Sequence, residues 1–224
     1  MLMKSQICKE IETRKIIAIL RGLTSEQSLK VADALVEGGI TLLEVAFDQR
    51  EKGNGYRSTL DSIRRIAEQN RPGTFVGAGT VMNREQVNMA REAGASFIIS
   101  PDVNKDVIQL TCEYGMVSIP GAYTATEINY AYSCGADYVK IFPASAAGPS
   151  YFKAIREPLG FIPILAVGGV NEENITDFLK AGAVGVGMGG NLVNKELIAR
   201  GQYHMLAQNA RKIVTKIADY RLSI

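Results

Sequence analysis

Two charged residues interrupt short apolar segments of the sequence: Glu44 in Leu42–Phe47 and Lys140 in Tyr138–Phe142. Successive side chains of a strand point to opposite faces, so each charge is expected on the face opposite its bulky neighbours, toward the interior. An amine in apolar surroundings loses its proton more readily and can attack a ketone, while a nearby carboxylate can carry protons. The pair predicts a Schiff-base lysine with an acid-base partner.

A buried ion pair that only stabilises the fold is the structural alternative. Such pairs are costly to remove from water, and apolar side chains fill a core more cheaply. We therefore favour a chemical role for Lys140 and Glu44.

Glycine pairs follow two other apolar segments, at Gly168-Gly169 and Gly189-Gly190. Without side chains, their backbone N–H groups are open to an anion such as phosphate. Glycines required only for tight turns are the alternative interpretation.

Arg21 and Thr80 also end apolar segments, and Thr80 follows Gly77-Ala78-Gly79. A threonine hydroxyl can orient a carboxylate or a proton, and glycines let a ligand approach the backbone. A segment that only stabilises the end of the strand is the alternative interpretation. No third glycine follows, so the segment is not a dinucleotide-binding fingerprint.

These residues lie in a regular alternation of strand-like and helix-like segments. Helices are expected at 25–37, 56–69, 84–93, 104–114, 126–133, 151–157, 171–180 and 202–220. The expected strands are Ile16–Arg21, Thr41–Phe47, Phe75–Val81, Phe97–Ser100, Met116–Pro120, Tyr138–Phe142, Pro163–Val167 and Val184–Met188.

Eight βα units either close into a barrel or stay open as a doubly wound sheet. The absence of a linker within 224 residues favours closure, and we predict one (β/α)8 TIM barrel domain over residues 1–224. An extra N-terminal helix over Lys4–Thr13 is expected to cover the barrel bottom. Active sites of such barrels lie at the C-terminal strand ends, and phosphate sites lie after strands seven and eight.

The composition excludes several classes of protein. Lys and Arg (25) nearly balance Asp and Glu (23), which predicts neither nucleic acid nor membrane as a partner. The single histidine, His204, argues against a zinc site or a Ser-His-Asp triad. Three scattered cysteines and no signal-peptide pattern favour a reduced, cytoplasmic setting.

In chain order, several motifs resemble those of the 2-keto-3-deoxy-6-phosphogluconate (KDPG) and 4-hydroxy-2-oxoglutarate (KHG) aldolases. The resemblance extends from about Ile16 to Val193. Its motifs are Glu44-Val45, Gly77-Ala78-Gly79-Thr80-Val81, Ser100-Pro101, Pro120-Gly121, Lys140-Ile141-Phe142-Pro143-Ala144 and Gly168-Gly169-Val170.

The resemblance implies a class I aldolase without metal or cofactor, usually a homotrimer, acting on a phosphorylated 2-keto-3-deoxy sugar acid. Lys140 would form the imine with pyruvate, and Glu44 would shuttle protons through water. Substrate-binding roles are implied for Thr80 at the pyruvyl carboxylate, Pro101 and Phe142 at the pocket wall, and Gly168, Gly169, Gly190 and Asn191 in the phosphate loops.

The sequence departs from the family pattern in three places. Asp48 stands where many members have a carboxylate-binding arginine, so Arg21 is expected to supply that cation, with Arg50 as the alternative. The long segment Asp48–Tyr56 predicts a mobile flap. Ala166-Val167 replaces the common Pro-Thr, and Asn191 replaces a frequent serine.

From these features we expect cleavage of KDPG to pyruvate and glyceraldehyde 3-phosphate, with KHG cleavage as a side activity. The departures lean toward 2-keto-3-deoxy-6-phosphogalactonate (KDPGal) as the alternative substrate. Two other classes stay open: a phosphosugar isomerase or epimerase with Glu44 as base, and a non-catalytic phosphosugar binder, for which Asp48 is the only hint.

Overall fold

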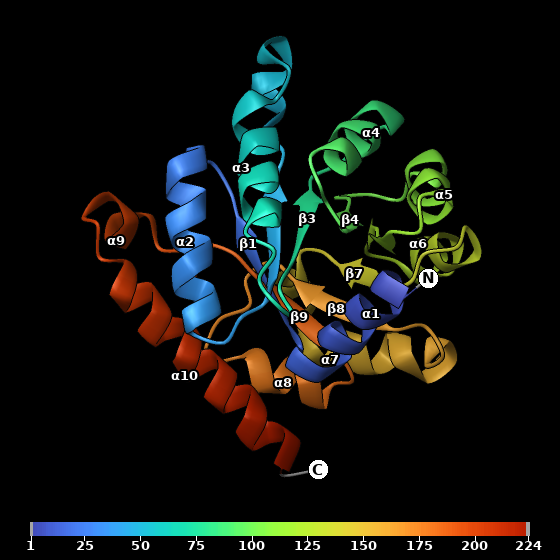
Figure 1. Ribbon diagram of the computed structural model, residues 1–224. Helices are drawn as coiled ribbons and strands as arrows, with labels where there is room; N and C mark the ends of the chain where they lie inside the picture. The colour runs from blue at the N-terminus through green and yellow to red at the C-terminus, as the bar shows by residue number, and fades with distance from the viewer. Residues whose placement is uncertain (1, 223–224) are drawn as a thin grey trace.

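A sheet of parallel strands lies at the centre of the computed structural model, which describes residues 2–222, and helices surround it (Figure 1). Within these residues the strand order is β5-β4-β3-β2-β1-β9-β8-β7-β6. The segments are β1 (Ile16–Leu20), β2 (Leu42–Ala46), β3 (Phe75–Gly79), β4 (Phe97–Ile99), β5 (Val117–Ile119), β6 (Gly121–Ala122), β7 (Val139–Ile141), β8 (Ile164–Val167) and β9 (Gly185–Met188).

The segments β5 and β6 are two parts of one strand, interrupted at Pro120. The β5 segment pairs with β4, and β6 pairs with β7. The backbone N–H of Lys140 donates to the Pro120 carbonyl (2.9 Å) and that of Tyr138 to the Ser118 carbonyl (3.2 Å), so β7 contacts both parts. The sheet therefore closes with eight strands, and the predicted (β/α)8 barrel is confirmed.

Side-chain alternation fills the barrel as predicted. On β2, Leu43 and Val45 pack in the core shared with the helices, whereas Leu42 packs in the barrel interior. The interior cluster consists of Ile7, Ile11, Ile17, Leu42, Phe97, Ile99, Val117, Ile119, Tyr138, Leu165 and Val167.

Helix α1 (Leu2–Arg14) covers the N-terminal end of the barrel. Its Ile7 and Ile11 are fully buried within the interior cluster. The Tyr138 hydroxyl makes hydrogen bonds to the Cys8 carbonyl (3.3 Å) and the Glu12 carboxylate (3.2 Å). The expected extra helix is present, and Tyr138, which belongs to the interior, is fixed to it through its hydroxyl.

The helices begin mostly where short polar side chains cap them. Thr24 and Thr124 form capping boxes with Gln27 and Glu127. The remaining helices are α2 (Ser25–Glu37), α3 (Arg57–Glu68), α4 (Arg84–Glu92), α5 (Lys105–Glu113), α6 (Ala125–Ser133), α7 (Ala144–Leu159), α8 (Ile175–Lys180), α9 (Lys195–Ala199) and α10 (Tyr203–Leu222). In residues 2–222, none of these helices has the length and apolar character needed to cross a bilayer.

Two helix predictions need correction, and two further helices were not predicted. The helix expected at 151–157 begins at Ala144 and is interrupted at Gly148 (φ 72°, ψ 162°), after which Pro149 opens its second part. Asn171 caps a turn, so α8 begins at Ile175. The expected flap forms a 3-10 helix, η1 (Gln49–Asn54), which the sequence analysis missed, as it missed α9.

The packing of α2 against α10 yields a stability prediction. A Cβ on Gly38 would overlap the Ala210 side chain and lie 2.7 Å from the Ala207 carbonyl oxygen. Gly38→Ala should therefore lower the free energy of unfolding by about 1–3 kcal/mol, since overpacking forces the helices apart. Gly53→Ala, with nothing within 4 Å of the new Cβ, is the control. Denaturant unfolding compares the two, and equal stability would contradict the close approach of α2 and α10.

Candidate active site

A cavity of about 450 Å³ opens at the C-terminal ends of the strands. It is lined by all ten residues that the sequence analysis singled out: Lys140, Glu44, Arg21, Thr80, Pro101, Phe142, Gly168, Gly169, Gly190 and Asn191. They come from seven of the eight strands of the barrel or from the loops after them. Closure of the sheet is thus what brings together residues 170 positions apart in the chain.

Lys140 is the middle residue of β7 and only 6% exposed. Its Nζ lies 5.4 Å from the centroid of the Phe142 ring, in cation–π geometry. Burial lowers the pKa of Lys140, the negative charge of Glu44 opposes this shift, and the positive charge of Arg21 adds to it. The amine is therefore closer to its neutral, nucleophilic form than a lysine on the surface.

Glu44 is the middle residue of β2 and 2% exposed. Its pKa is raised because burial penalises the carboxylate, while the positive charges of Lys140 and Arg21 act in the opposite direction. A carboxyl group whose pKa is raised in this way is suited to take up and release protons near neutral pH.

Glu44 and Lys140 influence each other without forming an ion pair. Each contributes to the pKa shift of the other, yet no ion pair within 4 Å joins them in the described part of the chain. Both line the same cavity. The arrangement leaves room for a substrate atom or a water between the two groups, which the structural ion-pair alternative would not.

Arg21 and Thr80 form a polar pair at the β1–β3 side of the cavity. Arg21 Nη2 donates to Thr80 Oγ1 at 2.9 Å. Arg21 makes no ion pair within residues 2–222. Its positive charge therefore stays available to an anionic group in the cavity.

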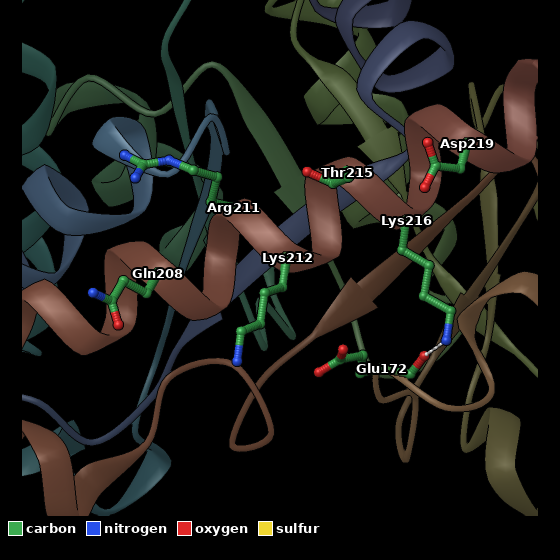
Figure 2. Close-up of a pocket in the computed structure, with 7 residues that line it drawn as sticks. All are labelled: Glu172, Gln208, Arg211, Lys212, Thr215, Lys216 and Asp219. Atoms are coloured by element: carbon green, nitrogen blue, oxygen red, sulfur yellow. Dashed lines mark hydrogen bonds between the residues drawn. The ribbon is translucent and has the colours of Figure 1, made fainter.

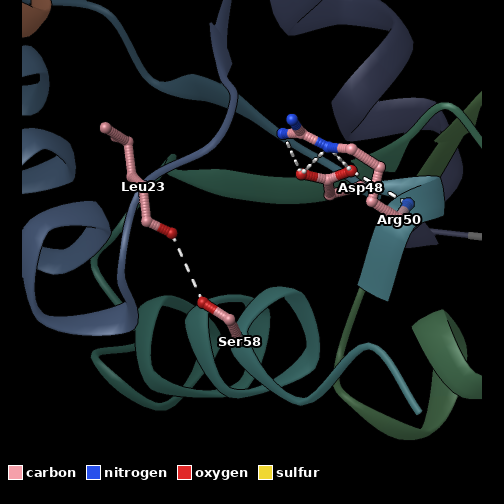
Figure 3. Close-up of polar contacts among 4 residues, drawn as sticks. All are labelled: Leu23, Asp48, Arg50 and Ser58. Atoms are coloured by element: carbon pink, nitrogen blue, oxygen red, sulfur yellow. Dashed lines mark hydrogen bonds and ion pairs between the residues drawn. The ribbon is translucent and has the colours of Figure 1, made fainter. Parts of the chain in front are cut away.

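Arg50, the alternative cation, is engaged elsewhere. Its guanidinium binds the Asp48 carboxylate through Nε (2.9 and 3.1 Å) and Nη2 (2.5 Å), as Figure 3 shows. The contact with Arg50 lowers the pKa of Asp48 to about 2. Arg50 is not among the cavity-lining residues, whereas Arg21 is.

The loops after β8 and β9 form another part of the cavity wall, beginning next to β1, with which β9 pairs. Gly168 and Gly169 have φ values of 93° and 77°, a left-handed conformation that favours glycine. No backbone hydrogen bond within residues 2–222 uses the N–H of Gly168, Gly169 or Gly190 as donor. These N–H groups are free to meet an anion. Asn191 donates from Nδ2 to the Val170 carbonyl (2.9 Å), so it links the two loops.

The glycines of β3 have a different purpose from the one expected. A Cβ on Gly77 would overlap the Phe97 ring, and a Cβ on Gly79 would overlap the Glu44 carboxylate. They make room for neighbouring side chains rather than for a ligand, and Gly79 in particular lets the Glu44 side chain lie across β3.

The sequence analysis gave no pocket role to part of the cavity wall, namely Ile19, Val167, Val170 and Gly187. Gly189, the first residue of the second glycine pair, also lines the cavity. Alternation along β1 would have placed Ile19 inward, two residues before Arg21. Arg21, Thr80 and Phe142 themselves lie just beyond their strands, not within them as expected, because the strands end one or two residues earlier.

A second depression, on the outer face of α10, contains none of these residues. Figure 2 shows its lining, which is Glu172, Gln208, Arg211, Lys212, Thr215, Lys216 and Asp219. Within this lining, Lys216 Nζ donates to the Glu172 backbone carbonyl (2.5 Å), and Arg211 and Lys212 are exposed. His204 is exposed as well. In residues 2–222 no cluster of His, Cys, Asp and Glu has the makings of a metal site.

Two relatives and one solved structure place these features among known proteins. The chain is 36% identical over 178 residues to 2-dehydro-3-deoxy-6-phosphogalactonate aldolase of Escherichia coli K12, covering 79% of this chain and 83% of that protein. It is 31% identical over 216 residues to 2-dehydro-3-deoxy-phosphogluconate aldolase of Pseudomonas aeruginosa, covering 96% and 93%.

The structural match is a KDPG aldolase from Legionella pneumophila that holds pyruvate as a covalent carbinolamine. It has a TM-score of 0.81 and 25% identity, covering 91% of this chain and 96% of that one. The family model "KDPG and KHG aldolase" matches residues 7–209. With its barrel and a buried lysine facing a carboxyl group across one cavity, the chain belongs to the KDPG and KHG aldolase family of lyases.

Proposed function

We propose that this aldolase cleaves a 2-keto-3-deoxy-6-phospho sugar acid to pyruvate and glyceraldehyde 3-phosphate through an imine on Lys140. The observation that carries the proposal is the position of Lys140, nine-tenths buried and opposite Glu44 in a cavity with an unpaired cation at one side and free N–H groups at the other.

The bond changes follow from this arrangement. The neutral amine of Lys140 attacks C2 of the substrate, and the carbinolamine loses water to give a protonated imine. Glu44, directly or through water, takes the proton of the C4 hydroxyl while the C3–C4 bond breaks and its electrons enter the imine. The resulting enamine takes a proton at C3, and hydrolysis releases pyruvate and the free lysine.

The two sides of the cavity fit the two ends of such a substrate. Arg21 and Thr80 would bind the carboxylate next to the reacting ketone, through a charged and a neutral hydrogen bond. The N–H groups of Gly168, Gly169 and Gly190, with Asn191 joining their loops, would bind the phosphate. Pro101 and Phe142 would form the wall between them.

The configuration of the substrate is the finer part of the proposal. The 36% identity to the galactonate enzyme exceeds the 31% identity to the gluconate enzyme, and Val167 lines the cavity where the family often has threonine. We propose KDPGal as the first candidate and keep KDPG, predicted from the sequence, with KHG as a side substrate.

The assembly and location implied by the resemblance complete the proposal: a homotrimer in the cytoplasm. Exposed aromatic side chains support association, because Tyr132 and Phe161 are 37% and 63% exposed and contact each other edge to face at 5.7 Å.

Trapping with borohydride tests the imine. Pyruvate and borohydride together should add one reduced pyruvyl group to Lys140, located by peptide mass spectrometry. Lys140→Met should lose the adduct and the activity, while Lys153→Met, at an exposed position, should keep both. A wild-type protein that is never modified yet interconverts phosphosugars would support the isomerase alternative, and one that binds phosphosugars without turnover would support the non-catalytic binder.

The pH dependence of trapping tests the electrostatics. Only the neutral amine attacks, so the trapping rate should rise with pH and level off above the pKa of Lys140, with a midpoint below the usual 10.5. Because the Glu44 charge raises the pKa of Lys140, Glu44→Gln should move the midpoint to lower pH. Rates measured in buffers from pH 5 to 10 give both midpoints, and a shift to higher pH would contradict the assignment.

Pyruvate release, coupled to lactate dehydrogenase, should distinguish the substrates. We expect kcat/KM for KDPGal to exceed that for KDPG by about 10-fold, the usual range for discrimination at one hydroxyl in a site that does not hydrogen-bond it. Both should exceed KHG, which lacks the phosphate. Val167→Thr, which introduces the threonine common in the family, is the matched variant. A wild-type preference for KDPG over KDPGal would contradict the order we propose.

A further inference from the structure

Hydrogen bonds connect Gln86 in the core to Gln49, Gln49 to the backbone carbonyl of Thr80, and the Thr80 hydroxyl to Arg21 at the cavity. We propose that Gln49, which does not line the cavity, is a positioning residue: it holds Thr80, and through Thr80 it keeps Arg21 directed at the substrate carboxylate. The inference rests on the proposed function, since that function assigns the carboxylate to Arg21 and Thr80.

Thr80 needs support from outside its own backbone. Its φ of 56° lies in the left-handed region, which is unusual and strained for a β-branched residue. Two side chains hold it there. Gln49 Nε2 donates to the Thr80 carbonyl (2.8 Å), and Arg21 Nη2 donates to the Thr80 hydroxyl (2.9 Å). Because the hydroxyl accepts from Arg21, its own proton is left to donate to a carboxylate.

The orientation of the Gln49 amide is determined by its partners. The Thr80 carbonyl can only accept, so the amide nitrogen must face it. The amide oxygen then accepts from the Tyr56 hydroxyl (3.2 Å) and from Gln86 Nε2 (3.0 Å). Tyr56 and Gln86 are 4% and 1% exposed, so this exposed glutamine is held from the core.

The backbone of Gln49 is fixed as well. Gln49 is the first residue of η1, and Asp48 caps that helix by accepting from the Arg50 backbone N–H at 3.0 Å. The following segment is tied down where Ser58 Oγ donates to the Leu23 carbonyl at 3.3 Å, which Figure 3 also shows.

Asp48 explains why Arg21 needs this support. The hydrogen bonds from Arg50 are the main cause of the low pKa of Asp48 and the Arg21 charge adds a smaller part, so Asp48 carries a negative charge that attracts Arg21. Thr80 is the only hydrogen-bonded partner of the Arg21 side chain within residues 2–222. Without the Gln49 contact, Thr80 would relax and the guanidinium would turn toward Asp48, away from the cavity.

The hydrogen bonds of Gln49 should affect the binding of the substrate carboxylate and not the reactivity of the Lys140 amine. Pyruvate and hydroxyacetone both present a ketone to Lys140, but only pyruvate carries a carboxylate. Loss of Gln49 should therefore weaken the reaction with pyruvate and spare the reaction with hydroxyacetone.

The experiment measures the second-order rate constant for borohydride trapping of each ketone on Lys140. Gln49→Met removes every hydrogen bond of the side chain. Gln49→Glu keeps an acceptor for Tyr56 and Gln86 but loses the donor to Thr80. Both should lower the constant for pyruvate by about 5- to 30-fold, the size of one or two hydrogen bonds, and leave that for hydroxyacetone within about twofold. Gln208→Met, on the exposed face of α10, is the matched control and should change neither.

The remaining outcomes distinguish a failure of the role proposed for Gln49 from a failure of the proposed aldolase function. In an Arg21→Met background, Gln49→Met should cause no further loss with pyruvate, and an additive loss would overturn the pathway through Arg21. An unchanged constant for pyruvate, or equal losses for both ketones, would overturn the inference while leaving the imine intact. If the wild type traps neither ketone on Lys140, the proposed function fails and the inference with it.

Discussion

The site depends on keeping one amine and one carboxyl group out of water without letting them neutralise each other. Lys140 and Glu44 are almost fully buried, and burial shifts the two pKa values toward each other, the lysine downward and the glutamate upward. A close ion pair would reverse both shifts by stabilising the charged forms. The separation between β2 and β7 across the barrel prevents it, so the geometry of the fold maintains both pKa shifts.

Much of the surrounding structure serves that separation. Leu42 and Tyr138 belong to the apolar cluster that fills the barrel below Glu44 and Lys140. Helix α1 covers this cluster at the end of the barrel opposite the cavity. Gly79 leaves space for the Glu44 side chain to lie across β3. Pro120 divides the strand next to β7, and both of its parts still contact the lysine strand. Each feature stabilises the fold and also determines where the two groups can be.

The proposed recognition of the substrate carboxylate falls to the rim of the cavity, where the sequence departs from the motifs that it otherwise resembles. An acidic residue, Asp48, occupies a position where an arginine is common, and it binds Arg50. Arg21 is left as the unpaired cation of the cavity, held through Thr80. The proposed role of Gln49 follows from this rearrangement, because a cation near a competing carboxylate needs a rigid partner to keep its direction.

The sequence by itself determined the barrel, its eight strands and the inward direction of Glu44 and Lys140, because hydrophobic periodicity and alternation are local properties of the chain. The ten residues to which it gave catalytic or substrate-binding roles are among the fifteen that line the cavity, although the family resemblance was needed to assign those roles. Only the tertiary structure decided that Glu44 and Lys140 share one cavity without forming an ion pair, and it also decided the engagement of Arg50 by Asp48, the left-handed conformation of Thr80 and the break at Pro120. The contacts of Gln49 with Thr80 and Gln86 span 31 and 37 residues, and no local pattern encodes them. Such contacts arise when the sheet closes, since closure alone sets which loops meet above the strand ends.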